Sequence, residues 1–191
     1  MRVKVKARFD EGPMKQLIWG ACLAIALASA VPAHADLATA VAAYDVGDFE
    51  AAAAEFRQLG RTGNAEAQYR LGLMHERGEG VAANDTTAWS WFKRAADGNH
   101  VAAQMRVAES YDNGRGVPMS RAEAYKWYKR AAESGNARAK AKVGLMNIHG
   151  HGKKPNYLEG VRWLREAAQA GDHEAQTVLD ELAAQSISAG S

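Results

Sequence analysis

Residues 122–132 read AEAYKWYKRAA, and this motif returns in the chain every 36 residues. It reads TTAWSWFKRAA at 86–96 and LEGVRWLREAA at 158–168. Further positions keep the same step: Trp91, Trp127 and Trp163; Gly78, Gly114 and Gly150; Gly80, Gly116 and Gly152; and Leu71, Val107 and Val143. Independent positions in one register indicate an internal repeat, and a period of this length is typical of stacked helical units.

Each repeat is predicted to consist of two helices, A and B, joined by a glycine loop. In the first repeat the apolar residues of 65–77 have helical spacing. Gly78 can adopt the left-handed conformation that ends a helix, and Gly80 allows a second tight bend. The tryptophans of helix B lie on the stripe that faces neighbouring helices, so Trp91, Trp127 and Trp163 are expected in the core.

The ends of helix B follow the same register. Each B helix is preceded by a good N-cap residue, namely Asn84, Ser120 or Asn156. Glu123 and Glu159 lie three positions after two of these caps, which predicts a reciprocal capping box. The helix is expected to end at Asn99, Gly135 or Gly171, residues that tolerate the left-handed conformation.

One such unit cannot bury both its faces, so stacking of units must supply the core. Residues 37–44 and 49–60 predict a partial helix pair ahead of the repeats, and residues 173–185 predict a final helix that covers the exposed end. Residues 186–191 are expected to fray. The predicted fold is an all-α solenoid, a superhelix of α/α pairs.

The pattern A-x-x-x-L-G, G-x-G-V and A-x-x-W-[FY]-x-x-A-A resembles the Sel-one-like repeat family, a relative of the tetratricopeptide repeat. The resemblance covers 65–172, as three repeats, and residues 36–64 resemble a partial tetratricopeptide unit. It implies an α/α superhelix with the A helices on the concave side, and adaptor or scaffold work rather than catalysis. The third repeat departs from the pattern, because Lys153 replaces Val81 and Val117, and Asn147 replaces Tyr111.

Residues 1–35 have the three parts of a secretory signal peptide. Residues 17–31 carry no charge and follow Lys15, and Ala33-His34-Ala35 places small residues before a cut at Asp36. Met14 begins such a leader more naturally than residues 1–13 do. Fifteen apolar residues are short for a membrane span, which needs about 20, so cleavage is favoured over a retained anchor. We therefore expect a periplasmic or secreted protein without stable membrane insertion after cleavage.

The composition of the expected mature chain excludes several classes of function. The whole chain has a net charge of +2, and removal of the leader leaves 19 basic against 20 acidic residues. This balance lacks the basic footprint of a nucleic-acid-binding protein. The single cysteine, Cys22, lies in the leader, so neither a disulfide nor a cysteine nucleophile is expected in the mature chain.

No cofactor, metal or catalytic residue is predicted. The G-x-G pairs lack the preceding strand and the G-K-[ST] of a phosphate-binding loop. His149 and His151 offer two imidazoles where zinc usually has three or four ligands, and they occupy exposed loop positions of the repeat. No nucleophile, base and orienting residue come together as hydrolysis requires.

A patterned surface is predicted on helix A beside its core stripe. Its candidate binding residues are Tyr69, Arg70, Leu73, Arg77, Met105, Arg106, Glu109, Asn113, Lys142, Leu145 and His149. Arg70, Arg106 and Lys142 would form a basic ladder beside a broken apolar strip, complementary to a protein or peptide with acidic and apolar residues. Alternatively, the apolar residues pack between repeats and the cations are merely solvated.

Two classes of function follow from the sequence. The favoured one is an exported, non-enzymatic interaction module that scaffolds or regulates an envelope or secreted complex through its helix A surface. The rival is a protein that binds or hydrolyses cell-wall glycan or peptide. The sequence leaves the partner and the oligomeric state open.

Overall fold

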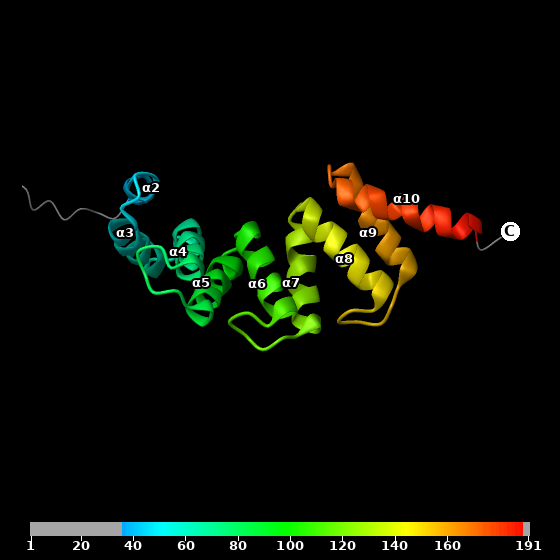
Figure 1. Ribbon diagram of the computed structural model, residues 1–191, viewed down its shortest axis with the longest axis horizontal. Helices are drawn as coiled ribbons and strands as arrows, with labels where there is room; N and C mark the ends of the chain where they lie inside the picture. Colours follow the sequence, from blue (N-terminus) through cyan, green and yellow to red (C-terminus); the bar gives the residue numbers. More distant parts are fainter. Residues whose placement is uncertain (1–35, 189–191) are drawn as a thin grey trace, which may run out of the picture. The chain divides into compact units, whose positions relative to one another are not determined.

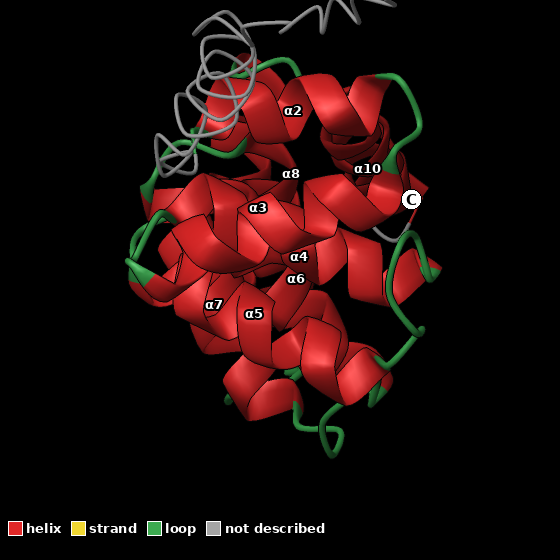
Figure 2. Cartoon of the chain, turned by 90° about the vertical axis from the view of Figure 1, so that its left-hand side faces the viewer, coloured by secondary structure: helices red, strands yellow, loops and turns green. Residues whose placement is uncertain are grey.

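The computed structural model describes residues 36–188, which form helices and loops without a strand (Figures 1 and 2). The expected leader lies outside the described residues. Consecutive helices pack against each other along the described part of the chain. The helices are α2 (Leu37–Asp45), α3 (Phe49–Arg61), α4 (Ala65–Arg77), α5 (Asp85–Asp97), α6 (Val101–Asn113), α7 (Arg121–Glu133), α8 (Ala137–His149), α9 (Tyr157–Gln169) and α10 (His173–Ser188). The predicted helical solenoid is confirmed.

The A helices α4, α6 and α8 end as the glycine spacing predicts. Gly78, Gly114 and Gly150 adopt left-handed conformations with φ of 74°, 70° and 71°. The B helices α5, α7 and α9 begin after side-chain caps from Asn84, Ser120 and Asn156. The last helix is longer than predicted, because α10 runs to Ser188 instead of ending at residue 185.

One of the two hydrogen bonds of the predicted reciprocal capping box is present, and the other is replaced by a different bond. The cap side chains accept from the backbone of Glu123 and Glu159, but the backbone N–H of Ser120 donates to the Tyr111 carbonyl oxygen at 2.8 Å. Asn156 does the same to the Asn147 carbonyl oxygen at 2.8 Å. The loop folds back on helix A, whose last carbonyl groups lack helical partners and so take the bond expected from glutamate.

The tryptophan register forms the core in two of three repeats. Trp127 is 9% exposed and Trp163 is 7% exposed. Trp91 is only partly buried, and the guanidinium of Arg94 lies over its ring at 4.7 Å. Trp91 packs near Gly60, whereas the same register position holds an alanine for the other two tryptophans. A Cβ atom on Gly60 would lie 3.3 Å from the Trp91 ring, so the ring packs closely on this glycine.

The departures of the third repeat are accommodated together. Asn147 is fully buried and donates to the Val143 carbonyl oxygen at 2.8 Å and to the Tyr125 hydroxyl at 3.3 Å. Lys153 donates to Glu159 at 2.9 Å and to the same hydroxyl at 3.4 Å. Asn147 and Lys153 are thereby joined through the Tyr125 hydroxyl of α7, at positions where the first two repeats hold His75 and Tyr111, and Val81 and Val117.

Within residues 36–188, no helix is long and apolar enough to cross a membrane.

Candidate functional site on the A helices

The structure gathers six of the predicted site residues around two hollows on neighbouring A helices. The first, the α4 hollow, has a volume of about 160 Å³ and is lined by Tyr44, Arg70, Leu73 and Arg77. The second, the α6 hollow, has a volume of about 60 Å³. Its lining residues are Glu76, Arg106, Glu109, Ser110, Asn113 and Arg115. The 36-residue register thus places equivalent helix A positions at both hollows.

A tyrosine from the partial repeat closes one side of the α4 hollow. The Tyr44 hydroxyl donates to Glu79 at 2.7 Å and accepts from Arg77 at 3.2 Å. The hydrogen bond to the Glu79 carboxylate, together with burial, raises the pKa of Tyr44 above its ordinary value. Arg77 lies 3.8 Å from Glu79, and its side chain is 52% exposed. Its guanidinium therefore retains donors for a further ligand.

The other side of the α4 hollow is held by an ion pair within helix α4. Arg70 donates to Glu66 at 2.5 Å and lies over the Phe56 ring at 5.9 Å. Glu66 also meets His100 at 2.9 Å. Burial alone would raise the pKa of Glu66, but hydrogen bonds from His100 and Arg70 and their charges lower it below its ordinary value. Arg70 is thus a fixed wall of the hollow.

The charged side chains that line the α6 hollow form an ion-pair network, and this network joins two repeats. Glu76 of α4 accepts from Arg106 and, at 2.6 Å, from Arg115. Arg106 also pairs with Glu109 at 2.9 Å, and Arg115 pairs with Asp85 at 2.9 Å. The Glu76 side chain is only 12% exposed, so it lies at the base of the network.

The three cations of the predicted basic ladder, Arg70, Arg106 and Lys142, differ in their ion pairs. Arg70 and Arg106 are neutralised by glutamates that lie on the same helices or the neighbouring repeat. Lys142 is partly buried on α8, and no ion pair of it occurs within residues 36–188. The charge pattern of a single helix does not predict the ion pair between Glu76 and Arg106, because this pair depends on how the repeats stack.

The apolar strip mostly packs between helices. Met105 is 7% exposed in the core cluster, and Tyr69 and Leu73 are partly buried against it. Leu145 is partly buried in the cluster around α8, α9 and α10. Of the apolar candidates, only Leu73 also lines a hollow. Met105 therefore packs between repeats, as the alternative prediction states. Leu73 both packs against the core and lines the α4 hollow.

His149 on α8 is exposed and lies outside both hollows. Its ring lies 5.6 Å from that of His151. Residues 36–188 hold no group of three or more His, Cys, Asp or Glu side chains that could bind a metal ion.

Four residues that line the hollows are not among the predicted binding residues: Tyr44, Glu76, Ser110 and Arg115. Tyr44 belongs to the partial repeat, which lacks the 36-residue register. Ser110 and Arg115 lie close in sequence to the predicted Glu109 and Asn113, but neither residue type recurs at the same position of the other repeats. For Glu76, the one sequence feature that points to the site is its position next to the predicted binding residue Arg77.

Comparison with known proteins identifies the class of this chain. Sel1 repeats match residues 65–100, 101–136 and 137–172, so the chain belongs to the Sel1 repeat family. Proteins of this family are generally protein-interaction modules and typically non-catalytic scaffolds. No curated protein matches the chain.

Solved structures show the same fold. A Sel1 repeat protein from Oxalobacter formigenes is 32% identical with a TM-score of 0.71, covering 75% of this chain. The protective antigen c5321 of uropathogenic Escherichia coli, which displays an SLR fold, is 27% identical with a TM-score of 0.69 over 75% of this chain. Helicobacter pylori cysteine rich protein B, 16% identical with a TM-score of 0.55, covers 68% of this chain and 96% of its own. The chain spans 59% of the first protein's length and 33% of the second's.

Proposed function

We propose that this protein is exported and acts as a non-enzymatic interaction module for a protein of an envelope or secreted complex. The partner segment lies along the ends of α4 and α6, from the α4 hollow to the α6 hollow. It supplies a carboxylate to Arg77 and an apolar side chain to Leu73. Export rests on the leader pattern of residues 1–35 and its A-x-A end.

The α4 hollow is the observation that carries the binding proposal. It combines an apolar floor at Leu73 with a half-exposed guanidinium, the mixture that fits an amphipathic peptide segment. Within residues 36–188 Arg77 has one long ion pair, at 3.8 Å, and one hydrogen bond to Tyr44, whereas Arg106 is paired with both Glu76 and Glu109. The cation with spare donors thus lies beside the larger of the two hollows, which makes it the anchor for an acidic side chain.

Site-specific photocrosslinking in cells tests the binding site. A photoreactive aromatic amino acid replaces Tyr44 of the α4 hollow in one variant and Asn113 of the α6 hollow in a second, and Lys126 in a control. The Lys126 side chain is 67% exposed on the B helix α7. We expect the same adduct protein from positions 44 and 113, identified by mass spectrometry, and its absence from position 126. An adduct from all three positions, or from position 126 alone, contradicts the proposed surface.

Fractionation tests export separately. The whole chain is expressed in its host, and the protein is recovered from the cytoplasmic, periplasmic and culture fractions. N-terminal sequencing is expected to begin at Asp36 in material from outside the cytoplasm. A soluble cytoplasmic product that begins at Met1 or Met14 would overturn export and leave the helix A surface to be judged by crosslinking alone.

A further inference from the structure

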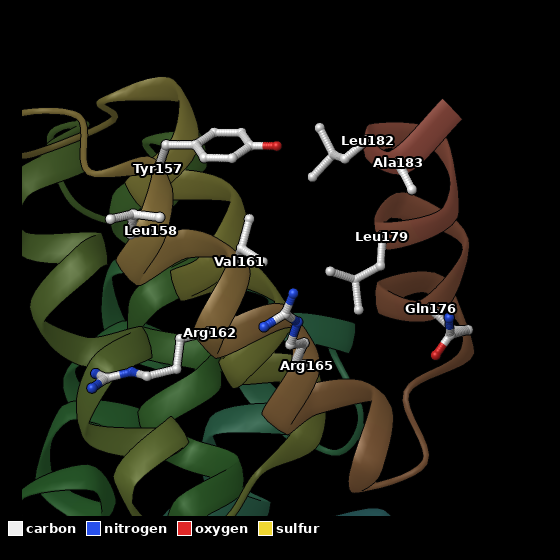
Figure 3. A pocket seen from close by; sticks show the side chains of 9 residues that line it. All are labelled: Tyr157, Leu158, Val161, Arg162, Arg165, Gln176, Leu179, Leu182 and Ala183. Carbon is white, nitrogen blue, oxygen red and sulfur yellow. The ribbon is translucent and has the colours of Figure 1, made fainter. Parts of the chain in front are cut away.

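A groove separate from the helix A hollows lies between α9 and α10 (Figure 3). Its volume is about 630 Å³. Tyr157, Leu158 and Val161 line it from α9, and Leu179 and Leu182 line it from α10. Leu158 is 82% exposed and Tyr157 is 51% exposed, so two of the four exposed large apolar residues in the described part of the chain lie here. The exposed face of α10 is polar, with Glu174, Thr177 and Glu181, as the terminal unit of a repeat stack usually requires. The exposed apolar residues Tyr157 and Leu158 are on the α9 wall of the groove.

The repeat register explains why the groove is open. α10 is the helix A of a fourth unit, because Leu179 and Leu182 occupy the positions of Val143 and Met146 one repeat earlier. In the third repeat these positions are buried, with exposures of 0% and 6%, in the core cluster that α8 shares with α5, α6 and α7. At the equivalent junction of α7 and α8, Asn147 donates to the Tyr125 hydroxyl at 3.3 Å. The same two register positions hold the smaller Val161 and Ala183 here, and both line the open groove between α9 and α10.

A standard B helix would not fit the neighbouring face of α10. The position that meets the large side chain of helix B is small in every repeat: Gly72, Ala108 and Gly144. A Cβ atom at Gly72 would lie 2.5 Å from the Phe92 ring, and one at Gly144 would lie 2.8 Å from Leu164. In α10 this position holds Asp180, whose carboxylate would be buried against an apolar side chain at a large desolvation cost. The face of α10 beside the groove therefore suits a polar contact better than a further repeat.

The α9 wall of the groove carries two arginines, Arg162 and Arg165, whereas the residues that line the α10 wall are uncharged. Arg165 lines the α9 wall, is exposed, and has no ion pair within residues 36–188. Gln176 lines the α10 wall and donates to Asp180 at 2.9 Å, which places that carboxylate at the edge of the same wall. Figure 3 shows Arg165 and Gln176 toward one end of the groove, and Tyr157 and Leu182 toward the other.

We propose that the groove binds the same groove of a second copy of this chain, so that the protein forms a two-fold symmetric dimer. A two-fold axis along the groove brings the α9 wall of each copy against the α10 wall of the other and keeps the two ends in register. Arg165 then meets Asp180 of the second copy, and Leu158 meets Leu182 of the second copy. The surface is self-complementary in charge and in apolar character, as an isologous interface requires.

Charge-swap variants of the whole chain, purified from its host, test the dimer by sedimentation velocity. Wild type is expected to dimerise at micromolar concentration. Arg165→Glu and Asp180→Lys should each weaken the dimer at least tenfold, because each places like charges opposite each other. An equimolar mixture of the two variants should recover the dimer, since α9 of each variant then faces an α10 of opposite charge.

Lys126→Glu is the matched control, because Lys126 is exposed on α7 and outside the groove. Its dimer constant should equal that of wild type, and circular dichroism should show that all variants keep their helix content. A wild-type chain that stays monomeric at roughly 100 µM overturns the proposal and assigns the groove to a helix of a different protein. A wild-type dimer that both variants leave unchanged also overturns it, by placing the interface elsewhere. Neither result bears on the helix A hollows.

Discussion

Gly116 lies so close to the backbone of Asp85 that a Cβ atom on Gly116 would be 2.2 Å from the Asp85 carbonyl oxygen. The same contact joins Gly80 to Phe49 and Gly152 to Arg121, at 2.2 Å and 2.3 Å. The second glycine of each loop therefore does more than turn the chain. It lets the loop of one unit rest on the first turn of the preceding B helix.

This contact predicts that Gly116→Ala is more destabilising than an ordinary glycine replacement. Gly116 has φ of 73°, which costs other residues about 1–2 kcal/mol, and the alanine methyl group would also clash with backbone. Gly135→Ala is the control, because Gly135 has φ of 92° and no atom within 4 Å of an added Cβ. Urea unfolding should show a loss larger for Gly116→Ala by about 1–3 kcal/mol. Equal losses would show that the close approach is not rigid.

The core prediction concerns Trp127, which is 9% exposed among α5, α6 and α7 residues. Trp127→Ala should lower the free energy of unfolding by about 3–5 kcal/mol. In a stack held by neighbour contacts, the loss should also raise hydrogen exchange in α5 and α9. Lys126→Ala, one residue earlier and 67% exposed on its side chain, should change stability little. An unchanged melting temperature for Trp127→Ala would remove the tryptophan from the core.

The α6 network predicts a cost for breaking it. Arg106→Ala leaves Glu76 with Arg115 alone, and the Glu76 side chain is 12% exposed. A buried acceptor that loses its partner costs about 1–3 kcal/mol. Lys129→Ala breaks an exposed pair of 3.7 Å on α7 and should cost less than about 1 kcal/mol. If thermal unfolding shows the two variants to be equally stable, Glu76 is solvated rather than held by the network.

The pair of Lys153 and Glu159 in the third repeat predicts a pH effect on stability. The hydrogen bond from Lys153 is the main cause that lowers the pKa of Glu159. A lowered folded pKa contributes stability above the unfolded value of about 4.3, and this stability is lost as pH falls through the folded pKa. Lys153→Val restores the residue of the other repeats and should raise the pKa of Glu159 toward its ordinary value. Carboxyl NMR titration measures this directly, and an unchanged Glu159 pKa would contradict the pairing.

Much of the fold follows from the sequence because repeat stacking is local. The bounds of α4 at Ala65 and Arg77 follow from periodicity and a glycine cap, which are properties of a few neighbouring residues. The pairing of Glu76 with Arg106 and Arg115 spans 30 and 39 residues, and it depends on the rotation between units. The sequence pattern therefore placed Arg106 on the right face but could not show that it was neutralised.

The α9–α10 groove is an intermediate case. One further step of 36 residues from Gly144 reaches Asp180, a signal that a sequence reading could have used. The Tyr44 contribution to the α4 hollow has no such signal, because the partial repeat does not share the register. Tyr44 reaches Glu79 only through the packing of α2 beside α4.

The affinity of the crosslinked partner protein for purified variants tests the central claim most directly. Arg77→Glu places a carboxylate beside Glu79 in the α4 hollow, and it should weaken binding at least tenfold by isothermal calorimetry. Wild-type affinity should also fall as salt rises, because exposed charges are screened beyond about 8–10 Å. Lys126→Glu, an equal charge change on α7, should leave the affinity unchanged. Partner binding by Arg77→Glu at wild-type strength, with its helix content intact, would contradict the account.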